Sequence, residues 1–265
     1  MTVYVFDNTL DGLLTAVFDS FFRKQQDVTL LADGEQLPLF ADEPHHVLTD
    51  AEKAARVWKG LEKQLSRDGL HMITISWLSE KRALNQPLFN MICKVFQQKR
   101  DISHNASDDD VLAVRNTCRR VLHETLRMKQ FIRFQKAKDG TYLAVVSPDH
   151  NVLPLITDHF ADRFNDQPWL IYDAKRHYGY YYGASPDPSK RRGEVIRVTF
   201  ENEAKVPFDL SNGKMDADIL SENDKIFQDL WRTYFKAICI KERMNPKKQL
   251  SDMPRRYWKY MTEKY

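Results

Sequence analysis

Basic and aromatic side chains alternate in two stretches of the chain, and both kinds of side chain can contact nucleic acid. Residues 167–182 (QPWLIYDAKRHYGYYY) include Trp169, Arg176 and Tyr178. The second stretch consists of Arg255, Arg256, Tyr257, Trp258 and Lys259. Cations attract phosphate in a salt-dependent way, and aromatic faces stack on bases. The pattern indicates a nucleic-acid surface. The alternative is that the tyrosines pack across strands and that the basic residues form a solvated turn and rim.

Three further arginines lie in the same half of the chain: Arg127, Arg133 and Arg163. Arginine forms bidentate contacts with phosphate and stacks on bases. We therefore expect these residues and Arg176 to converge with residues 255–259 on one face that engages phosphate.

Candidates for catalysis in this region are His159 and Asp173. The sequence contains no Gly-rich phosphate loop, no dinucleotide fingerprint and no deaminase zinc signature, and it lacks the strings typical of uracil-DNA glycosylases. Asp7–Thr9 follows a predicted strand as in aspartate-nucleophile phosphatases, but Val5 occupies the nucleophile position. Whether the protein is an enzyme is left open, and the catalytic residues are unassigned.

Metal binding and cofactors are not predicted. Cys93, Cys118 and Cys239 are far apart in sequence, and His45–His46 is an isolated pair. Iron–sulfur clusters need closely arranged thiolates, and separated cysteines favour buried thiols in a reducing compartment. No apolar run is long enough to span a membrane, and the N-terminus does not resemble a signal peptide. We expect a cytoplasmic protein without a membrane association.

The chain of 265 residues can form one large domain or two small ones. Its net charge of +3 is too small to indicate a nucleic-acid partner by itself. The predicted fold class is α+β, with a mainly helical half over residues 1–126 and a sheet region over 127–265, which could also form one continuous domain.

The second half is predicted to contain a ββαββ unit with antiparallel pairing and the helix on one face. Strands are expected at 131–135 and 141–147 around the Asp139–Gly140 turn, then a helix over 152–164, then strands at 169–173 and 178–182. A last strand over 195–200 and a long helix over 221–244 follow. A short helix after Pro254 should bury Tyr257 and Met261 and leave the arginines outward.

In the first half, hydrophobic spacing predicts a strand at 3–6 and a helix from Leu10 capped by Asn8 or Thr9. Short extended pieces surround Asp33–Gly34. Further helices are expected at 49–66, 70–84, 88–98 and 107–126, the first opened by a capping box at Thr49.

Four segments resemble a bacterial family known mainly as a domain of unknown function: RMKQFIRFQ, DGTYLAVVSPDHNVLPLITDHFADRF, QPWLIYDAKRHYGYY and MPRRYWKYMTE. Together with the N-terminal VYVFDNTLDGLLTAVFDSFF, the resemblance covers nearly the whole chain. Members are labelled probable DNA metabolism proteins and are typically encoded beside a radical SAM protein linked to DNA repair or modification. A related domain precedes some uracil-DNA glycosylase-type domains. One departure is Leu126, where the family pattern often has histidine.

The resemblance implies an accessory protein of DNA repair or modification that acts with a radical SAM partner. This protein is expected to bind nucleic acid, and DNA is the kind of nucleic acid expected. The alternative from another class is a stand-alone enzyme acting on nucleic acid or nucleotides, with its site at His159, Arg163, Asp173 and Arg176. A purely structural interaction module is a third interpretation.

Overall fold

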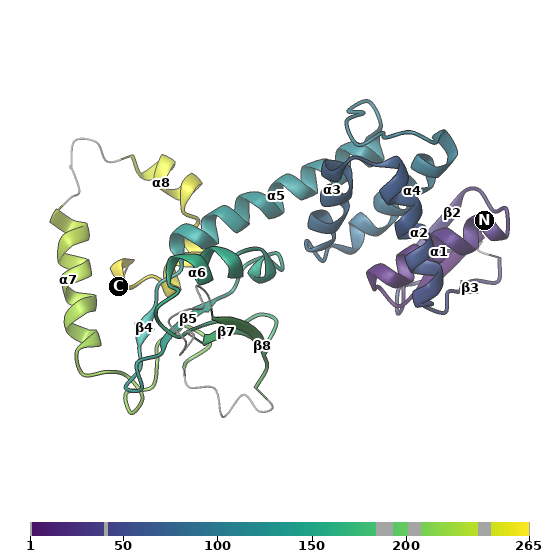
Figure 1. Cartoon of the computed structure of the whole chain (residues 1–265). Helices are drawn as coiled ribbons and strands as arrows, with labels where there is room; N and C mark the ends of the chain where they lie inside the picture. The colour runs from purple at the N-terminus through teal and green to yellow at the C-terminus, as the bar shows by residue number, and fades with distance from the viewer. Residues whose placement is uncertain (1, 40–41, 184–192, 201–207, 238–244, 265) are drawn as a thin grey trace. The chain divides into compact units, whose positions relative to one another are not determined.

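The computed structural model describes residues 2–39, 42–183, 193–200, 208–237 and 245–264 (Figure 1). The protein is α+β, and the chain divides into two compact units, residues 1–122 and 123–265. The division falls within helix α5 (Asp109–Phe131), four residues before the boundary expected from the sequence.

The first unit contains a three-stranded parallel sheet with β1 (Thr2–Phe6) between β2 (Val28–Ala32) and β3 (His45–His46). Its helices are α1 (Leu10–Phe22), α2 (Ala51–Gln64), α3 (Arg67–Trp77), η1 (Arg82–Leu84) and α4 (Asn85–Gln98). Tyr4, Leu13, Leu61, Ile73 and Leu88 are fully buried in its core. The period of the apolar residues thus predicted α1, α2 and α4 closely, whereas the helix expected over 70–84 is divided into α3, which ends at Trp77, and η1.

Asp7 and Thr9 form a helix cap at the start of α1. The Asp7 carboxylate accepts hydrogen bonds from the Thr9 N–H and hydroxyl and from the Thr49 hydroxyl, and the Thr9 hydroxyl accepts from the Gly12 N–H. Burial acts to raise the pKa of Asp7, but these hydrogen bonds outweigh it and lower the pKa. The phosphatase-like string is therefore structural. Asp50, rather than Thr49, caps α2.

The second unit is organised around a five-stranded sheet of order β4-β5-β6-β7-β8. The strands are β4 (Gln135–Lys136), β5 (Tyr142–Val146), β6 (Trp169–Asp173), β7 (Tyr178–Gly183) and β8 (Glu194–Val198). Three of these four pairings are antiparallel, but β5 and β6 are parallel. The expectation of antiparallel pairing was wrong here because residues 147–168 form a crossover, through η2 (Leu153–Leu155) and α6 (Thr157–Arg163), that returns the chain to the edge where β5 begins.

The strand predicted over 131–135 is largely absent, because α5 continues to Phe131, residues 132–134 have no regular structure and β4 begins only at Gln135. Val121, Thr125, Met128 and Ile132 are buried at spacings of three or four residues, the period of one helix face. The helix thus reaches the first residue of the predicted strand, and the strand that remains, β4, is only Gln135–Lys136.

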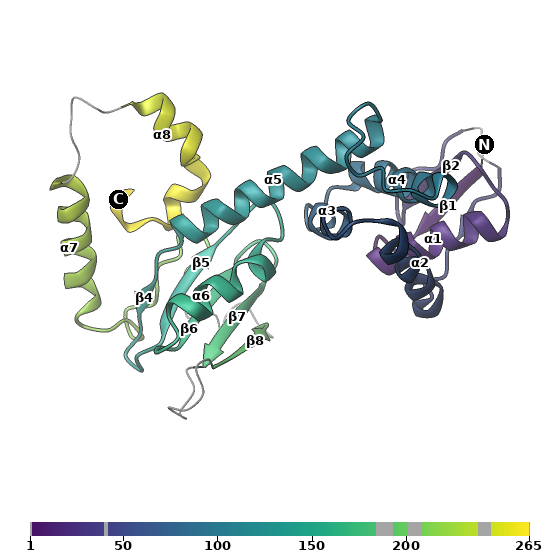
Figure 2. The ribbon, with the colours of Figure 1, turned by 45° about the horizontal axis from the view of Figure 1, so that its top comes forward.

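Both faces of the sheet are covered. Trp169 stacks on Tyr182 and meets Phe160 of α6 edge-to-face, and Figure 2 shows α6 lying across these strands. Leu143 and Tyr172 point to the other face, where they are buried in one cluster with Phe208 and Met215.

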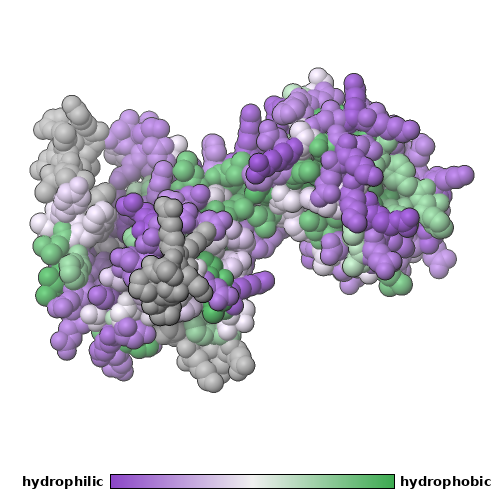
Figure 3. All heavy atoms as spheres, in the orientation of Figure 1, coloured by the Kyte–Doolittle hydropathy of each residue, from purple (hydrophilic) through white to green (hydrophobic). Residues whose placement is uncertain are grey.

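The C-terminal segment packs back onto the second unit. Its elements are α7 (Asp224–Ala237), α8 (Pro246–Asp252), η5 (Arg255–Tyr260) and η6 (Thr262–Lys264). Tyr257 and Met261 are buried, as predicted. The long helix is described over 224–237, and residues 238–244 of the predicted range lie outside the described part of the chain. Its apolar side chains Ile226, Phe227 and Leu230 are exposed, in the region where Figure 3 shows apolar atoms over α7.

Among the described residues, no helix is long and apolar enough to cross a membrane.

Candidate functional site

Glu124 of α5 is the centre of a hydrogen-bond network in the second unit. Its side chain is 2% exposed and accepts hydrogen bonds from the Asp149 N–H at 3.0 Å and the His150 N–H at 2.8 Å. It also accepts from the Tyr257 hydroxyl at 2.5 Å and the Arg256 guanidinium at 3.3 Å. This one carboxylate therefore joins α5, the loop after β5 and the C-terminal segment.

The hydrogen bonds keep Glu124 ionised. Burial acts to raise its pKa, but the Tyr257 hydroxyl and the two backbone N–H groups outweigh it and lower the pKa. The same contact, together with burial, raises the pKa of the Tyr257 phenol. Tyr257 is thus a neutral hydrogen-bond donor that anchors the C-terminal segment.

Two of the predicted phosphate-binding arginines are anchors of this network. Arg256 pairs with Asp149 at 3.0 Å as well as with Glu124, although 42% of its side chain is exposed. Arg176 pairs with Asp173 at 2.8 Å and donates to the carbonyls of Pro148 and Asp149. Both arginines of the 255–259 cluster are exposed, as expected from the sequence, but Arg256 also reaches back to the buried Glu124 carboxylate, which the sequence analysis did not anticipate.

The catalytic candidates do not form one site. Asp173 is fully buried, and it accepts from the Lys175 and Arg176 N–H groups besides its ion pair. Burial raises the pKa of Asp173 against the effect of Arg176. His159 lies half-buried on α6, where burial and the charges of Lys129 and Arg163 lower its pKa. In the part of the chain that the structure describes, no hydrogen bond or ion pair joins His159 to Asp173, and Asp173 anchors the turn that follows β6.

The other predicted arginines differ in how far they are engaged. Arg133 binds Glu263 at 2.7 Å and lies over the Trp231 ring, and Arg127 donates to the Ser251 carbonyl at 3.0 Å. Arg163 is exposed and lies over the Phe164 ring. The contacts therefore tie Arg127 and Arg133 to the C-terminal segment, while Arg163 is exposed to solvent.

The aromatic residues predicted to contact nucleic acid also differ in how far they are exposed. Trp169 is 1% exposed and Tyr178 is 4% exposed, and the Tyr178 hydroxyl donates to Asn151. Neither ring presents a face to solvent, so both belong to the packing of the sheet in this structure. Trp258 is partly exposed and its indole N–H donates to the Met253 carbonyl at 3.0 Å.

An exposed group of cations lies over aromatic rings in the C-terminal segment. Arg255 and Lys264 lie 5.9 and 4.6 Å from the Trp258 ring centre, and Lys259 lies 4.6 Å from that of Tyr260. Arg255 and Lys259 are exposed. We call residues 255–264 the basic-aromatic segment. Tyr257 and Met261 fix it to the unit, while Arg255 and Lys259 face solvent.

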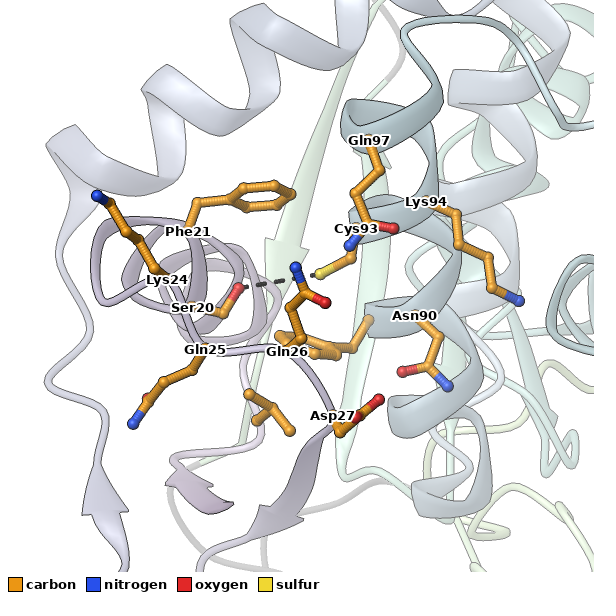
Figure 4. A pocket seen from close by; sticks show the side chains of 12 residues that line it. Ser20, Phe21, Lys24, Gln25, Gln26, Asp27, Asn90, Cys93, Lys94 and Gln97 are labelled. Carbon is orange, nitrogen blue, oxygen red and sulfur yellow. Dashed lines mark hydrogen bonds between the residues drawn. The ribbon is translucent and has the colours of Figure 1, made fainter. Parts of the chain in front are cut away.

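A polar pocket of about 610 Å³ lies in the first unit between α1 and α4 (Figure 4). The Ser20 hydroxyl and the Cys93 thiol point toward one another across it at 4.0 Å. Burial raises the pKa of Cys93 to about 12, so the thiol is neutral and is not an activated nucleophile. Lys94 at its rim pairs with Asp108 and Asp110.

Glu124 and Asp149 were missed as site residues by the sequence analysis. A usable signal was present, since Glu124 lies on the apolar stripe of α5, between Val121 and Met128. A carboxylate at a core position requires buried donors. Within the described residues, no three His, Cys, Asp or Glu side chains are grouped as metal ligands.

Comparison with known proteins gives one match. Neither the curated proteins nor the solved structures contain a significant match to this chain. A family model described as a domain of unknown function, DUF4130, matches residues 82–263. The match covers the Glu124 network and the basic-aromatic segment, and it leaves out α1 and with it one wall of the polar pocket. The chain therefore belongs to the DUF4130 family of domains of unknown function.

Proposed function

We propose that this protein is an accessory protein of DNA repair or modification that binds nucleic acid and acts with a radical SAM partner. Its second unit engages the phosphate backbone through the basic-aromatic segment. The radical SAM partner and the DNA context come from the family resemblance of the sequence.

The observation that carries the proposal is the arrangement of the basic-aromatic segment. Arg255 and Lys259 are exposed above aromatic rings, and the segment is held in place by buried Tyr257. Cations beside ring faces are the combination that binds single-stranded nucleic acid without sequence preference. A fixed segment loses little conformational entropy on binding, which favours affinity.

The remaining predicted residues are assigned by their contacts. Arg163 of α6 is exposed and, with Lys129 of α5, is close enough to lower the pKa of His159, so these two cations are a secondary candidate for phosphate contact beside the acidic Asp162. Arg127, Arg133, Arg176 and Arg256 support the surface by holding its elements together. Trp169 and Tyr178 are buried, so we leave them out of the proposed surface. A stand-alone enzyme is less favoured, because the buried ion pair of Asp173 leaves this carboxylate no access to a substrate.

The proposal is tested by titrating fluorescent single-stranded and duplex DNA with wild type and the Arg255→Ala/Lys259→Ala variant. The matched control is Lys59→Ala/Lys63→Ala, which removes two exposed lysines from α2 of the first unit. The binding constant K falls as salt rises. Losing two phosphate contacts should make the slope of log K against log salt less steep, by about 1.4 on single strands and about 1.8 on duplex DNA. The melting temperature should fall by no more than about 3–6 °C, because exposed cation–π contacts contribute about 0.5–1 kcal/mol each.

An unchanged slope in Arg255→Ala/Lys259→Ala, or an equal loss in the control, would contradict the proposed surface. The partner is tested by affinity purification from the native host. The proposal predicts co-purification of a protein containing an iron–sulfur cluster. A protein that turns over a nucleic-acid substrate alone would favour the enzyme alternative.

A further inference from the structure

A cavity of about 320 Å³ lies in the second unit between the end of α5, the turn at 212–215, α7 and the basic-aromatic segment. Tyr260 and Thr262 of that segment line it, as do Val145 of the sheet and Gln228 of α7. Small-molecule sites range from about 300 to 1,000 Å³, so the volume suits one small ligand rather than an oligomer.

Four cations, Arg133, Lys214, Lys225 and Arg232, line the cavity together with one carboxylate, Asp224. Arg133 is paired with Glu263 and Arg232 with Asp229, so Lys225 is the cation on which the inference mainly relies. Asp224 is occupied, because it accepts from the Lys136 N–H at 2.8 Å and from the Gln228 carboxamide at 3.4 Å. Lys225 is exposed and forms no ion pair within the described part of the chain. An anionic group is the ligand that such a lining favours.

The other walls are apolar and amide-bearing. Val145, Met215, Leu220 and Tyr260 supply apolar surface. The carboxamide of Gln135 donates to the Gly213 carbonyl and accepts from the Met215 N–H, which holds the turn beside Tyr260. Apolar surface with an aromatic ring suits a planar base, and carboxamides such as that of Gln228 pair with base edges.

We infer that this cavity takes a single nucleoside monophosphate group, either as one unstacked nucleotide of a bound strand or as a free nucleotide. The base lies against Tyr260 and the apolar wall, and the phosphate lies toward Lys225 and Arg232. This inference rests on the proposed function, since Tyr260 belongs both to the cavity and to the segment proposed to bind nucleic acid, with Lys259 over its ring.

The test measures binding of thymidine monophosphate, thymidine, inorganic phosphate and a twelve-residue oligothymidylate to the full chain. Two variants address the cavity. Lys225→Ala removes the phosphate contact. Gln228→Trp fills the cavity from an α7 position whose carboxamide donates only two long hydrogen bonds, of 3.4 Å, to the Phe134 carbonyl and to Asp224. Lys247→Ala, an exposed lysine of α8 outside the cavity, is the charge-matched control.

The inference predicts that thymidine monophosphate binds and competes with the oligonucleotide. Its affinity should fall about tenfold in Lys225→Ala, the effect of one lost charged contact. Gln228→Trp should abolish its binding, and Lys247→Ala should leave it unchanged. Saturation-transfer NMR should show the base protons in contact with the protein in wild type only. Circular dichroism melts establish that the variants are folded.

Failure of the inference and failure of the proposed function give different results. If the oligonucleotide binds but thymidine monophosphate neither binds nor competes, the cavity is not a nucleotide site. If inorganic phosphate competes as well as the nucleotide, the base has no site here and the inference is overturned. Binding of the nucleotide without the oligonucleotide would refute the proposed function and leave the cavity as a site for free nucleotides.

Discussion

Replacing Glu124 by glutamine should destabilise the second unit and release the basic-aromatic segment. One carboxylate oxygen accepts from the Asp149 N–H, the Tyr257 hydroxyl and Arg256, and the other accepts from the His150 N–H. A carboxamide has one acceptor oxygen. Its NH₂ group must therefore face a donor, and the hydrogen bonds that remain lose their charge.

The magnitude follows from these contacts. A buried donor left without an acceptor costs about 1–3 kcal/mol, and a hydrogen bond to a charged group is stronger by about 1 kcal/mol than a neutral one. Glu124→Gln should therefore lower the free energy of unfolding by about 2–4 kcal/mol. This corresponds to a fall of roughly 6–12 °C in the melting temperature for a unit of this size.

The assay is thermal and urea unfolding, combined with hydrogen exchange of residues 253–264. Glu222→Gln, at an exposed position of the same unit, is the control. Exchange in this segment should rise in Glu124→Gln and stay unchanged in the control. A melting temperature within 1 °C of wild type, with unchanged exchange, would refute the assignment of Glu124 as the anchor.

Three further predictions follow from the same contacts. The pKa of Glu124 is lowered from 4.5 in the folded protein. Its ionised form therefore stabilises the folded protein above pH 4.5, and this stabilisation is lost as the pH falls through the lower pKa of the folded state. The difference in free energy of unfolding between wild type and Glu124→Gln, measured with urea, should shrink from pH 6 to pH 3. Gly213 has φ +73°, and an added Cβ would lie 2.8 Å from the Tyr260 ring. Gly213→Ala should therefore lower the free energy of unfolding by about 1–3 kcal/mol, more than Gly140→Ala, where φ is +90° but no atom lies within 4 Å of the added Cβ. Equal melting temperatures of the two variants would contradict this. Cys93, with its pKa raised to about 12, should resist iodoacetamide at pH 8 in the native protein and react after unfolding, as peptide mapping can show; rapid native modification would disprove its burial.

The sequence predicted local structure well where one period dominates. Leu10–Phe22 and Trp169–Asp173 were found from their spacing, and the tail was correctly expected to bury Tyr257 and Met261. The end of α5 was missed because Phe131, Ile132 and Phe134 have high strand propensity. The helix extends to Phe131 because burial of Val121, Thr125 and Met128 on one face outweighs this propensity.

Pairing and charge partners could not be read from the sequence in the same way. The parallel pairing of β5 and β6 depends on where the crossover through α6 returns, which no local pattern specifies. Arg256 and Glu124 are 132 residues apart, so their contact exists only in the folded unit. The sequence shows that Arg255 and Arg256 are adjacent cations, but only the fold separates an exposed cation from an anchor.

Mapping of photochemical cross-links tests the central claim most directly. Oligonucleotides containing 5-bromouracil would be cross-linked to the wild-type chain, alone and with its co-purified partner, and the modified peptides sequenced by mass spectrometry. Our account predicts cross-links within residues 255–264, at Trp258 or Tyr260, that decline in Arg255→Ala/Lys259→Ala and persist in Lys59→Ala/Lys63→Ala. Cross-links confined to the first unit, or none with either preparation, would contradict it.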